Sequence, residues 1–521
     1  MNSTKIEKIK IALSNKYLEW VEKLPEFRGG QIADLQTHRK FDREEAKKNW
    51  ETTKPLAENE LEFLSIRLIE LFNVEDFEKL EAGLLKLFPK LLDPSRYRDF
   101  RATFQKQSEA IHGGRWNPIG YVFRSQEKRP IGMQVYTELP SLPPEVDYIK
   151  VELQHFLPSM IAVVFDVRLN DEANRQINRI QRELTFPNVR FHNILPWKLW
   201  RGHWSFPPAI VQRRKVIDWT RMLRNRVEAC IKPYLRGHFL ERGTGKSYEL
   251  PALEIFILSG VPENKKDFGE WKDRSSAWLE SYGIDLRFDF YQNESFLFVP
   301  SDSKDDEAWG RPTARLLVLT DHFLKDEKHK ESKSREKDIV FYRLALGHLR
   351  ALGLLTGILE FLESIQKDVQ KLRKVTVNRM TSRSRLKSHL NFYGKILQVS
   401  TLLDRAEFEY EQQKALIVDE TQILTEIQFS PGTFKTTSNL QLDTLQTIEY
   451  RINLIKRHLK YLQTSFSDYV GLQNIKSTNR LQWTVLWLSV IATVAAILSV
   501  IAGWPAIKQF LKDVFRIDLG N

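Results

Sequence analysis

Three polar residues in the first third of the chain have side chains of types that can act in catalysis. Arg115 lies in the run HGGRWNP at 112–118, and Tyr136 and Glu145 follow it. An arginine can bind pyrophosphate through two parallel hydrogen bonds, and a glutamate can stabilise the positive charge that develops on a reacting ribose. Arg115, Tyr136 and Glu145 are the candidate catalytic residues, although their spacing alone does not group them.

The same run resembles the GGRWNP signature of RES domains, which are NAD-consuming toxins related to ADP-ribosyltransferases. In that family a strand tyrosine and then a helix glutamate follow the arginine, so the resemblance implies these roles for Tyr136 and Glu145. Around Glu145 this chain has LPSLPPEV in place of the family's alanine-rich helix. A membrane-tethered NAD-consuming enzyme is therefore an alternative function, and the leading expectation is a protein that is not an enzyme and has no bound cofactor.

Metal and nucleic-acid chemistry have little support in the composition. Cys230 is the only cysteine among 521 residues, which excludes a disulfide framework and a multi-cysteine zinc or iron–sulfur site. The histidines are scattered, so no metal is expected. The 79 basic and 67 acidic residues give a net charge of +12, but no recognisable nucleic-acid module accompanies it, and a nucleic-acid partner is not expected.

A segment near the C-terminus predicts a transmembrane helix. Residues 481–504 read LQWTVLWLSVIATVAAILSVIAGW and contain no charge. As a helix they would extend about 36 Å, which exceeds a hydrocarbon core of about 30 Å. Trp483, Trp487 and Trp504 lie where aromatic rings settle at the headgroups. The N-terminus does not resemble a signal peptide, so we expect a single-pass membrane protein with its N-terminal head in the cytoplasm.

The ends of this segment carry two further signals. Ala495, Ser499 and Gly503 recur every four residues, a small-residue spacing that lets transmembrane helices pack closely. The tail at 505–521 has apolar residues on one helical face and predicts an amphipathic interfacial helix. We therefore expect the lipid bilayer as one partner and homo-oligomer formation as a consequence of the span.

Residues 339–480 predict a helical stalk that resembles a coiled coil. Apolar residues alternate at steps of three and four in three runs, at 355–372, 392–410 and 445–469. An antiparallel path would bring the turn between the first two helices close to the membrane. The basic residues there are candidates for contact with anionic headgroups: Arg379, Arg383, Arg385 and Lys387.

The remaining chain predicts a globular head. Residues 1–100 show helical patterns, including 6–24 and 58–88, residues 101–325 mix strands with helices, and 326–338 form a charged linker. The expected strands lie at 160–169, 253–259, 286–291, 296–299 and 316–320, and expected helices lie at 170–184 and 208–235. The fold class is thus an α+β, or mixed α/β, head with a helical stalk and one C-terminal transmembrane helix.

This order of parts is similar to that of CorA-type magnesium channels, which also have an α/β head, a long stalk helix and C-terminal membrane insertion. Those channels carry a Gly-Met-Asn motif where this chain has Gly503-Trp504-Pro505, so their ion selectivity does not carry over. We expect sensing, scaffolding or an effector role through assembly of the stalk and span, with an oligomeric pore as an alternative. The protein partner is not identifiable from the sequence.

Overall fold

The computed structural model describes residues 59–92, 116–125, 135–182, 188–191, 203–206, 208–242, 250–262, 265–284, 286, 290–300, 314–320, 347–380, 386–430 and 438–515, with residues 16, 23 and 44. The chain divides into two compact units. Unit 1 consists of Met1–Leu362 and Ala406–Tyr450, and unit 2 of Glu363–Arg405 and Arg451–Asn521. The expected linker at 326–338 lies outside the described residues, and of the expected helix at 6–24 only residues 16 and 23 are described, both helical.

Unit 1 is built on a ten-stranded mixed sheet with the order β12-β9-β10-β11-β8-β1-β5-β4-β2-β3. Its strands are β1 (Glu60–Asn73), β2 (Trp116–Phe123), β3 (Tyr136–Glu138), β4 (Val146–Leu157), β5 (Met160–Leu169), β8 (Ala252–Ser259), β9 (Phe290–Gln292), β10 (Phe296–Val299), β11 (Ala314–Leu319) and β12 (Gln428–Ser430). β11 runs parallel to β8 and β3 parallel to β2, and the other pairs are antiparallel. β6 (Asn188–Phe191) and β7 (His203–Phe206) form a separate pair. The fold is therefore mixed α/β, as the sequence predicts.

The helical expectation for 58–88 is wrong in its first half. Residues 60–73 form β1, which pairs with β5 on one side and β8 on the other. Its run ELEFLSIRLIELFN has apolar residues at helical spacing, but the strand is buried on both faces, as central strands are. The second half of the expectation is correct, because α3 (Phe77–Leu87) is a helix.

Several expected strands and helices are confirmed. β5 matches the expected strand at 160–169, β10 matches 296–299, and β8 and β11 cover most of their expected ranges. Within the expected strand at 286–291, Phe290 and Tyr291 belong to β9, Leu286 does not belong to a strand, and 287–289 lie outside the described residues. The sequence analysis missed β2, β4 and β12. β4 alternates apolar residues with Lys150, Glu152 and Gln154, and these polar residues hid a strand that is buried along most of its length.

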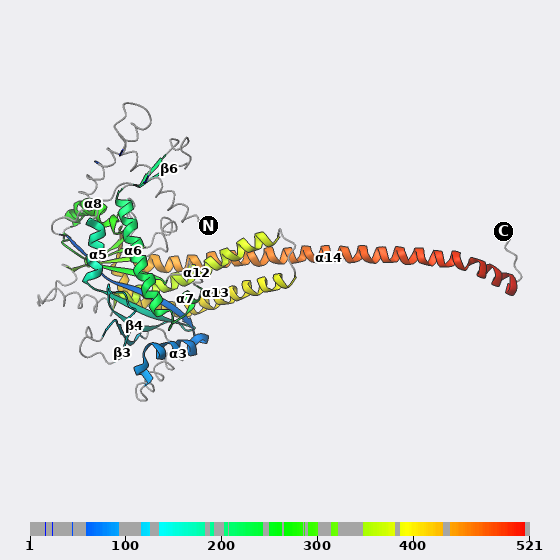
Figure 1. Cartoon of the computed structure of the whole chain (residues 1–521), viewed down its shortest axis with the longest axis horizontal. Helices are drawn as coiled ribbons and strands as arrows, with labels where there is room; N and C mark the ends of the chain where they lie inside the picture. Colours follow the sequence, from blue (N-terminus) through cyan, green and yellow to red (C-terminus); the bar gives the residue numbers. More distant parts are fainter. Residues whose placement is uncertain are drawn as a thin grey trace, which may run out of the picture. The chain divides into compact units, whose positions relative to one another are not determined.

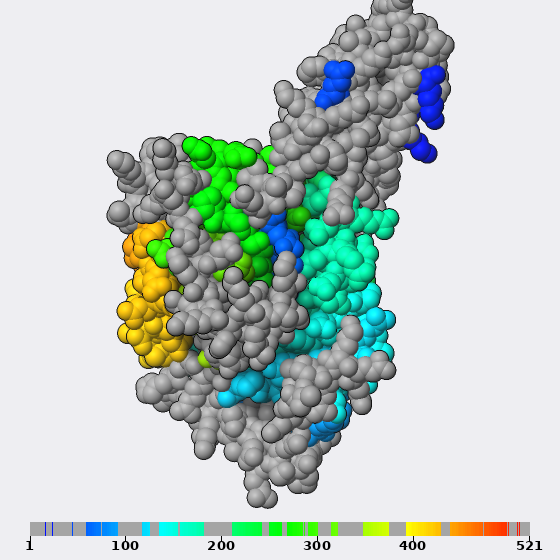
Figure 2. Space-filling model, turned by 90° about the vertical axis from the view of Figure 1, so that its left-hand side faces the viewer, coloured from blue at the N-terminus to red at the C-terminus, as the bar shows by residue number. Residues whose placement is uncertain are grey.

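The helices α5, α6 and α8 lie next to one another in unit 1 (Figure 1). Their bounds and those of the shorter helices are α5 (Asp171–Arg182), α6 (Pro208–Ile231), α7 (His238–Arg242), α8 (Lys265–Ser281), and the 3₁₀ helices η1 (Val74–Asp76), η2 (Pro89–Leu92) and η5 (Gln422–Glu426). α5 and α6 confirm the helices expected at 170–184 and 208–235. β12 pairs with β9, and Figure 2 shows yellow and orange atoms of the later part of the chain on the same face as green atoms of its middle part.

Three long helices contribute residues to both units: α12 (His348–Met380), α13 (Leu386–Glu420) and α14 (Leu440–Phe515). Within unit 2, the rings of Phe392 and Tyr393 in α13 lie 5.8 and 5.3 Å from that of Phe466 in α14. Arg451 of α14 pairs with Glu363 of α12 at 3.2 Å. These contacts show that all three helices pack together in unit 2.

α14 is one continuous helix of 76 residues. It passes through Pro505 and ends at Phe515, whereas the sequence predicts a separate interfacial helix from residue 505. A proline inside a helix lacks one backbone N–H and bends the helix without necessarily ending it. Figure 1 shows that the red C-terminal end of α14 is bent.

Candidate functional site

The structure assigns different surroundings to the candidate catalytic residues. Arg115 lies outside the described residues. Tyr136 is the first residue of β3, and the Lys90 ammonium lies 3.2 Å from the centroid of its ring. This is a cation–π contact, and it engages the face of the tyrosine.

Glu145 lies just before β4 and is buried. Its Oε1 accepts a hydrogen bond of 2.8 Å from Nη2 of Arg226, a residue of α6. This ion pair gives the carboxylate a structural partner within the protein. A catalytic role for Arg115, Tyr136 and Glu145 therefore stays a prediction from the sequence.

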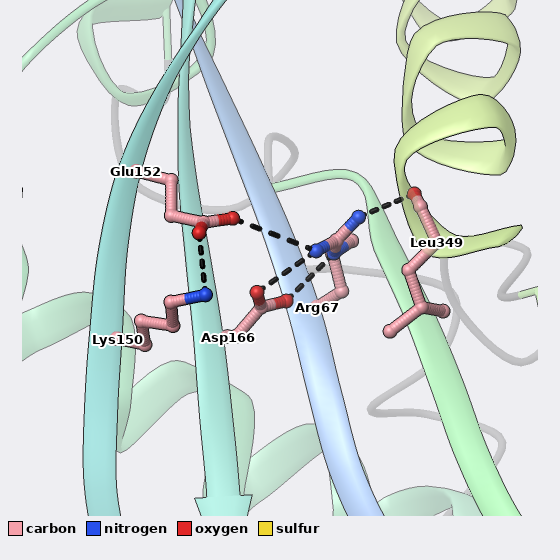
Figure 3. Close-up of polar contacts among 5 residues, drawn as sticks. All are labelled: Arg67, Lys150, Glu152, Asp166 and Leu349. Atoms are coloured by element: carbon pink, nitrogen blue, oxygen red, sulfur yellow. Dashed lines mark hydrogen bonds and ion pairs between the residues drawn. The ribbon is translucent and has the colours of Figure 1, made fainter. Parts of the chain in front are cut away.

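A buried cluster of four charges lies in the middle of the sheet, and the sequence analysis missed it (Figure 3). Arg67 of β1 donates to Asp166 of β5 through two hydrogen bonds, Nε to Oδ1 at 2.6 Å and Nη2 to Oδ2 at 2.8 Å. Glu152 of β4 has Oε2 4.0 Å from Nη2 of Arg67 and Oε1 2.5 Å from Nζ of Lys150. Two cations and two anions thus balance one another, with Arg67, Asp166 and Glu152 buried and Lys150 partly exposed.

Strand register brings these charges together. Arg67 is directly opposite Asp166 in the β1–β5 pair, and Lys150 is directly opposite Asp166 in the β4–β5 pair. Paired residues project to the same face of a sheet, so all four side chains meet. A charged residue inside each of two apolar strand runs, SIRLI and VVFDV, is the signal that could have indicated the pair.

The cluster also joins the sheet to α12. Nη1 of Arg67 donates to the backbone oxygen of Leu349 in the first turn of α12 (Figure 3). Burial on its own would lower the pKa of Arg67, but the Asp166 carboxylate, helped by Glu152, raises that pKa above its ordinary value. The guanidinium is therefore a permanent charge, and the arrangement suits a structural connection better than proton transfer.

Glu70 lies three residues after Arg67 on β1, so its side chain points to the opposite face of the sheet. Its carboxylate accepts hydrogen bonds from the backbone N–H groups of Phe239 at 2.7 Å and Leu240 at 2.8 Å, both in α7. Burial raises the pKa of Glu70 to about 7, although backbone N–H donors, those of Gly237 and Leu71 included, act to lower it. A side chain at Gly237 would collide with the carbonyl oxygen of Leu71, so glycine permits this close approach.

The C-terminal half of α14 exposes a continuous apolar surface. In the described part of the chain, α14 is the one helix long and apolar enough to cross a membrane, with a mean hydropathy of 1.5 in its most apolar window and none of that window buried. Its large exposed apolar residues in this region are Leu481, Trp483, Val485, Leu486, Trp487, Leu488, Val490, Ile491, Val494 and Ile497. Soluble proteins seldom expose so large an apolar surface, which indicates a membrane or a protein partner.

The remaining residues singled out from the sequence lie on the long helices or outside the described residues. Ala495 and Ser499 are exposed on α14, and Gly503 follows them on the same helix. Arg379 belongs to the last turn of α12, and Lys387 to the first turn of α13. Arg383 and Arg385 lie between these helices, outside the described residues.

Comparison with known proteins adds no relative. No protein-family model matches this chain, and no curated protein or solved structure is significantly similar to it. Among the residues that the structure describes, no group of histidine, cysteine, aspartate or glutamate side chains could hold a metal ion. The exposed apolar part of α14 is therefore the main structural indication of function.

Proposed function

We propose that this chain is a single-pass membrane protein in which α14 carries the transmembrane segment at 481–504. The observation that carries this proposal is the uncharged, fully exposed apolar surface between Leu481 and Ile497. Burial of apolar surface is worth roughly 25 cal/mol per Å², so leaving these side chains in water would be costly. At about 1.5 Å per residue, the segment is long enough for a hydrocarbon core of about 30 Å.

The helices α12, α13 and α14 act in this proposal as a stalk between the membrane and the sheet of unit 1. Support comes from burial at the expected heptad positions within unit 2. The buried residues there are Ile365, Val369, Leu372, Phe392, Ile396, Leu403, Ile452, Ile455, Leu459 and Leu462. Their spacing of three and four residues is that of a helical bundle with a shared apolar core.

The adjoining ends of α12 and α13 come close to the membrane in this arrangement. The contact of Phe392 with Phe466 aligns α13 with α14, and α13 begins at Leu386, about 9 Å along its axis from Phe392. Leu481 lies about 22 Å beyond Phe466, so α13 begins about 13 Å short of the span. A headgroup layer of about 6 Å and the length of a basic side chain cover this gap. Arg379 and Lys387, together with Arg383 and Arg385 between them in the sequence, are the candidates for contact with anionic lipid.

The same geometry favours a cytoplasmic head. Lys476 and Arg480 precede the span and Lys508, Lys512 and Arg516 follow it, so the immediate flanks do not set the orientation. The positive charge that favours the head side is that of Arg379, Arg383, Arg385 and Lys387. Positively charged residues close to a span are retained on the cytoplasmic side, where anionic lipids also concentrate. The head would serve as a sensing or scaffolding domain whose output depends on assembly of the stalk and span into a homo-oligomer.

Membrane anchoring is tested with three versions of the chain expressed in bacteria: the full chain, a chain ending at Arg480 and a chain ending at Trp504. Membranes are collected and washed at high salt and at alkaline pH. The full chain and the version ending at Trp504 should resist both washes, because both keep the span, and the version ending at Arg480 should be released. Retention of the version ending at Arg480 after the alkaline wash would contradict the proposal.

A further inference from the structure

A groove of about 540 Å³ lies between α12 and α14 within unit 2. Val369, Arg373 and Lys374 of α12 form one wall, and His458, Tyr461 and Leu462 of α14 form the other. Pockets of roughly 300–1,000 Å³ hold small organic ligands, so the groove has room for more than an inorganic ion. The proposed membrane anchoring assigns no role to this groove.

The groove has a basic rim. Arg373, Lys374 and His458 carry basic groups, and no acidic side chain is among the described residues that line it. The acidic groups on the nearest turns of α12 are engaged elsewhere: Asp368 pairs with Lys371 at 3.2 Å, and Glu363 pairs with Lys367 at 2.6 Å. The groove therefore favours an anion, and a guanidinium beside an ammonium is a common pair for phosphate.

The floor and one wall are apolar or aromatic. Val369 and Leu462 are buried at the base of the groove, whereas Tyr461 is 62% exposed. The guanidinium of Arg373 lies 6.0 Å from the centroid of the Tyr461 ring. The guanidinium lies over one face of the ring, and because the ring is exposed, a flat ligand ring can stack on its other face or on the guanidinium plane. Gln370, which also lines the groove, adds an amide that can donate or accept hydrogen bonds.

The distance between the groove and the proposed span distinguishes a phosphate on a lipid headgroup from a phosphate on a soluble molecule. Tyr461 precedes Leu481 by about 30 Å along α14. The headgroup layer extends only about 6 Å beyond the hydrocarbon core, so a lipid held in the bilayer does not reach the groove. We infer that the groove binds a soluble phosphorylated molecule with a flat ring, of the size of a mononucleotide.

Such a ligand would contact α12 and α14 at the same time. Any ligand that binds the packed helices and not the separated ones stabilises the packed arrangement. The groove thus offers a way for a soluble metabolite to strengthen the association of two helices in unit 2. The choice of a soluble ligand over a lipid headgroup rests on the proposed span, whereas nucleotide binding to the groove is measured without a bilayer, so the two proposals can fail separately.

The test uses the full chain in a neutral detergent and isothermal titration calorimetry. The probes are AMP, GMP and inorganic phosphate, with vesicles of phosphatidylglycerol and phosphatidylcholine as a separate arm. We expect at least one nucleotide to bind with a Kd below 1 mM and at least tenfold more tightly than inorganic phosphate. Absence of nucleotide binding at millimolar concentration would overturn the inference, and so would binding only to the anionic vesicles.

Two exposed lysines provide a matched pair of variants. Lys374→Glu reverses a charge that lines the groove, and Lys460→Glu makes the same change on an exposed residue of α14 that is not among the lining residues. Lys374→Glu should weaken nucleotide binding at least tenfold and Lys460→Glu less than threefold. Tyr461→Leu should remove the preference for a nucleotide over phosphate. Equal weakening by both lysine variants would show a general electrostatic effect and overturn the site.

Discussion

Arg67 and Asp166 face each other across β1 and β5 and share two hydrogen bonds, although 99 positions separate them in the chain. Both side chains are almost completely buried. The guanidinium also reaches the first turn of α12 through the carbonyl oxygen of Leu349. A single residue thus connects two sheet strands and a helix that lies far away in the sequence.

Replacement of Arg67 by methionine should strongly destabilise unit 1. The variant leaves the Asp166 and Glu152 carboxylates buried without their arginine, and loss of one partner from a buried ion pair costs about 3–5 kcal/mol. Urea unfolding of the full chain in detergent, followed by far-UV circular dichroism, measures the change. Lys367→Met removes an exposed partner of Glu363 and should cost less than about 1 kcal/mol. Similar losses for the two variants would contradict the structural role of Arg67.

Glu70 should make stability fall as the pH rises. Its pKa is about 7 in the folded protein and 4.5 as the ordinary value, so the folded state holds a proton that the unfolded state has lost between these values. Its contribution is therefore fully present below pH 4.5 and lost as the pH rises through 7, at up to about 1.4 kcal/mol per pH unit. The stability of the unmodified chain relative to Glu70→Gln should therefore decrease as the pH rises from 4.5 to 7, which urea unfolding of both proteins at several pH values measures. An unchanged slope in the variant would show that Glu70 does not titrate in this range.

His348 should have the opposite effect. Burial lowers its pKa from 6.5 to about 4, and its ring lies 4.3 Å from that of Phe296. The contribution of His348 is present above pH 6.5 and lost as the pH falls toward 4. Between pH 4.5 and 6.5 the contributions of His348 and Glu70 oppose each other, so they nearly cancel in the unmodified chain. His348→Leu should therefore make stability fall with rising pH in this range, whereas Glu70→Gln should make it rise. Parallel pH profiles for the two variants would refute this assignment.

A charge in the centre of the proposed span should impair membrane insertion. Ile491 and Leu472 are both large exposed residues of α14, at 60% and 66% exposure, but only Ile491 lies within 481–504. An arginine near the middle of a transmembrane helix costs about 2.5–3.5 kcal/mol on insertion scales. Ile491→Arg should therefore reduce the fraction that resists an alkaline wash, whereas Leu472→Arg should not. Equal retention of both variants would argue against a span at this position.

Small residues in the span should support assembly. Ala495→Leu combined with Ser499→Leu enlarges the face on which helices are expected to approach, and we expect it to reduce cross-linked dimers in native-like bilayers by at least half. Thr493→Leu enlarges the other side of α14 and should leave cross-linking unchanged. Cross-linking of the full chain at several concentrations, with gel analysis, distinguishes these results. A strictly monomeric full chain would remove both the assembly and the pore alternative.

The extent to which the fold was predictable differs from strand to strand. β5 was predicted correctly because MIAVVFDVRL is nearly all apolar. The apolar part of α14 was predicted as a helix because it has no charge over a length that core helices of soluble proteins rarely reach. β1 was missed because its apolar spacing fits a helix as well as a strand, and only pairing with both β5 and β8 decides between them. A local sequence pattern therefore predicts an element best where the run is almost entirely apolar, and least well where the spacing of apolar residues fits both a helix and a strand.

The residues of the candidate sites also divide into those that the local sequence predicts and those that depend on contacts between distant segments. The basic groove was not recognised, because Arg373 and Tyr461 lie on different helices and meet only through packing. The Arg67–Asp166 pair depends on strand register, which the sequence specifies only through contacts between distant segments. The RES-like motif was visible because its residues are contiguous, but contiguity does not position Tyr136 beside Glu145, and their contacts to Lys90 and Arg226 follow from the fold.

The pairing of β12 with β9 has a consequence for the order in which the protein is made. β12 lies between α13 and α14, so the edge of the sheet is completed by a strand that is synthesised after most of the long helices. Every segment of unit 1 ends by Tyr450, and the apolar segment begins later, at Leu481. All residues of the ten-stranded sheet are therefore synthesised before those of the proposed span at 481–504.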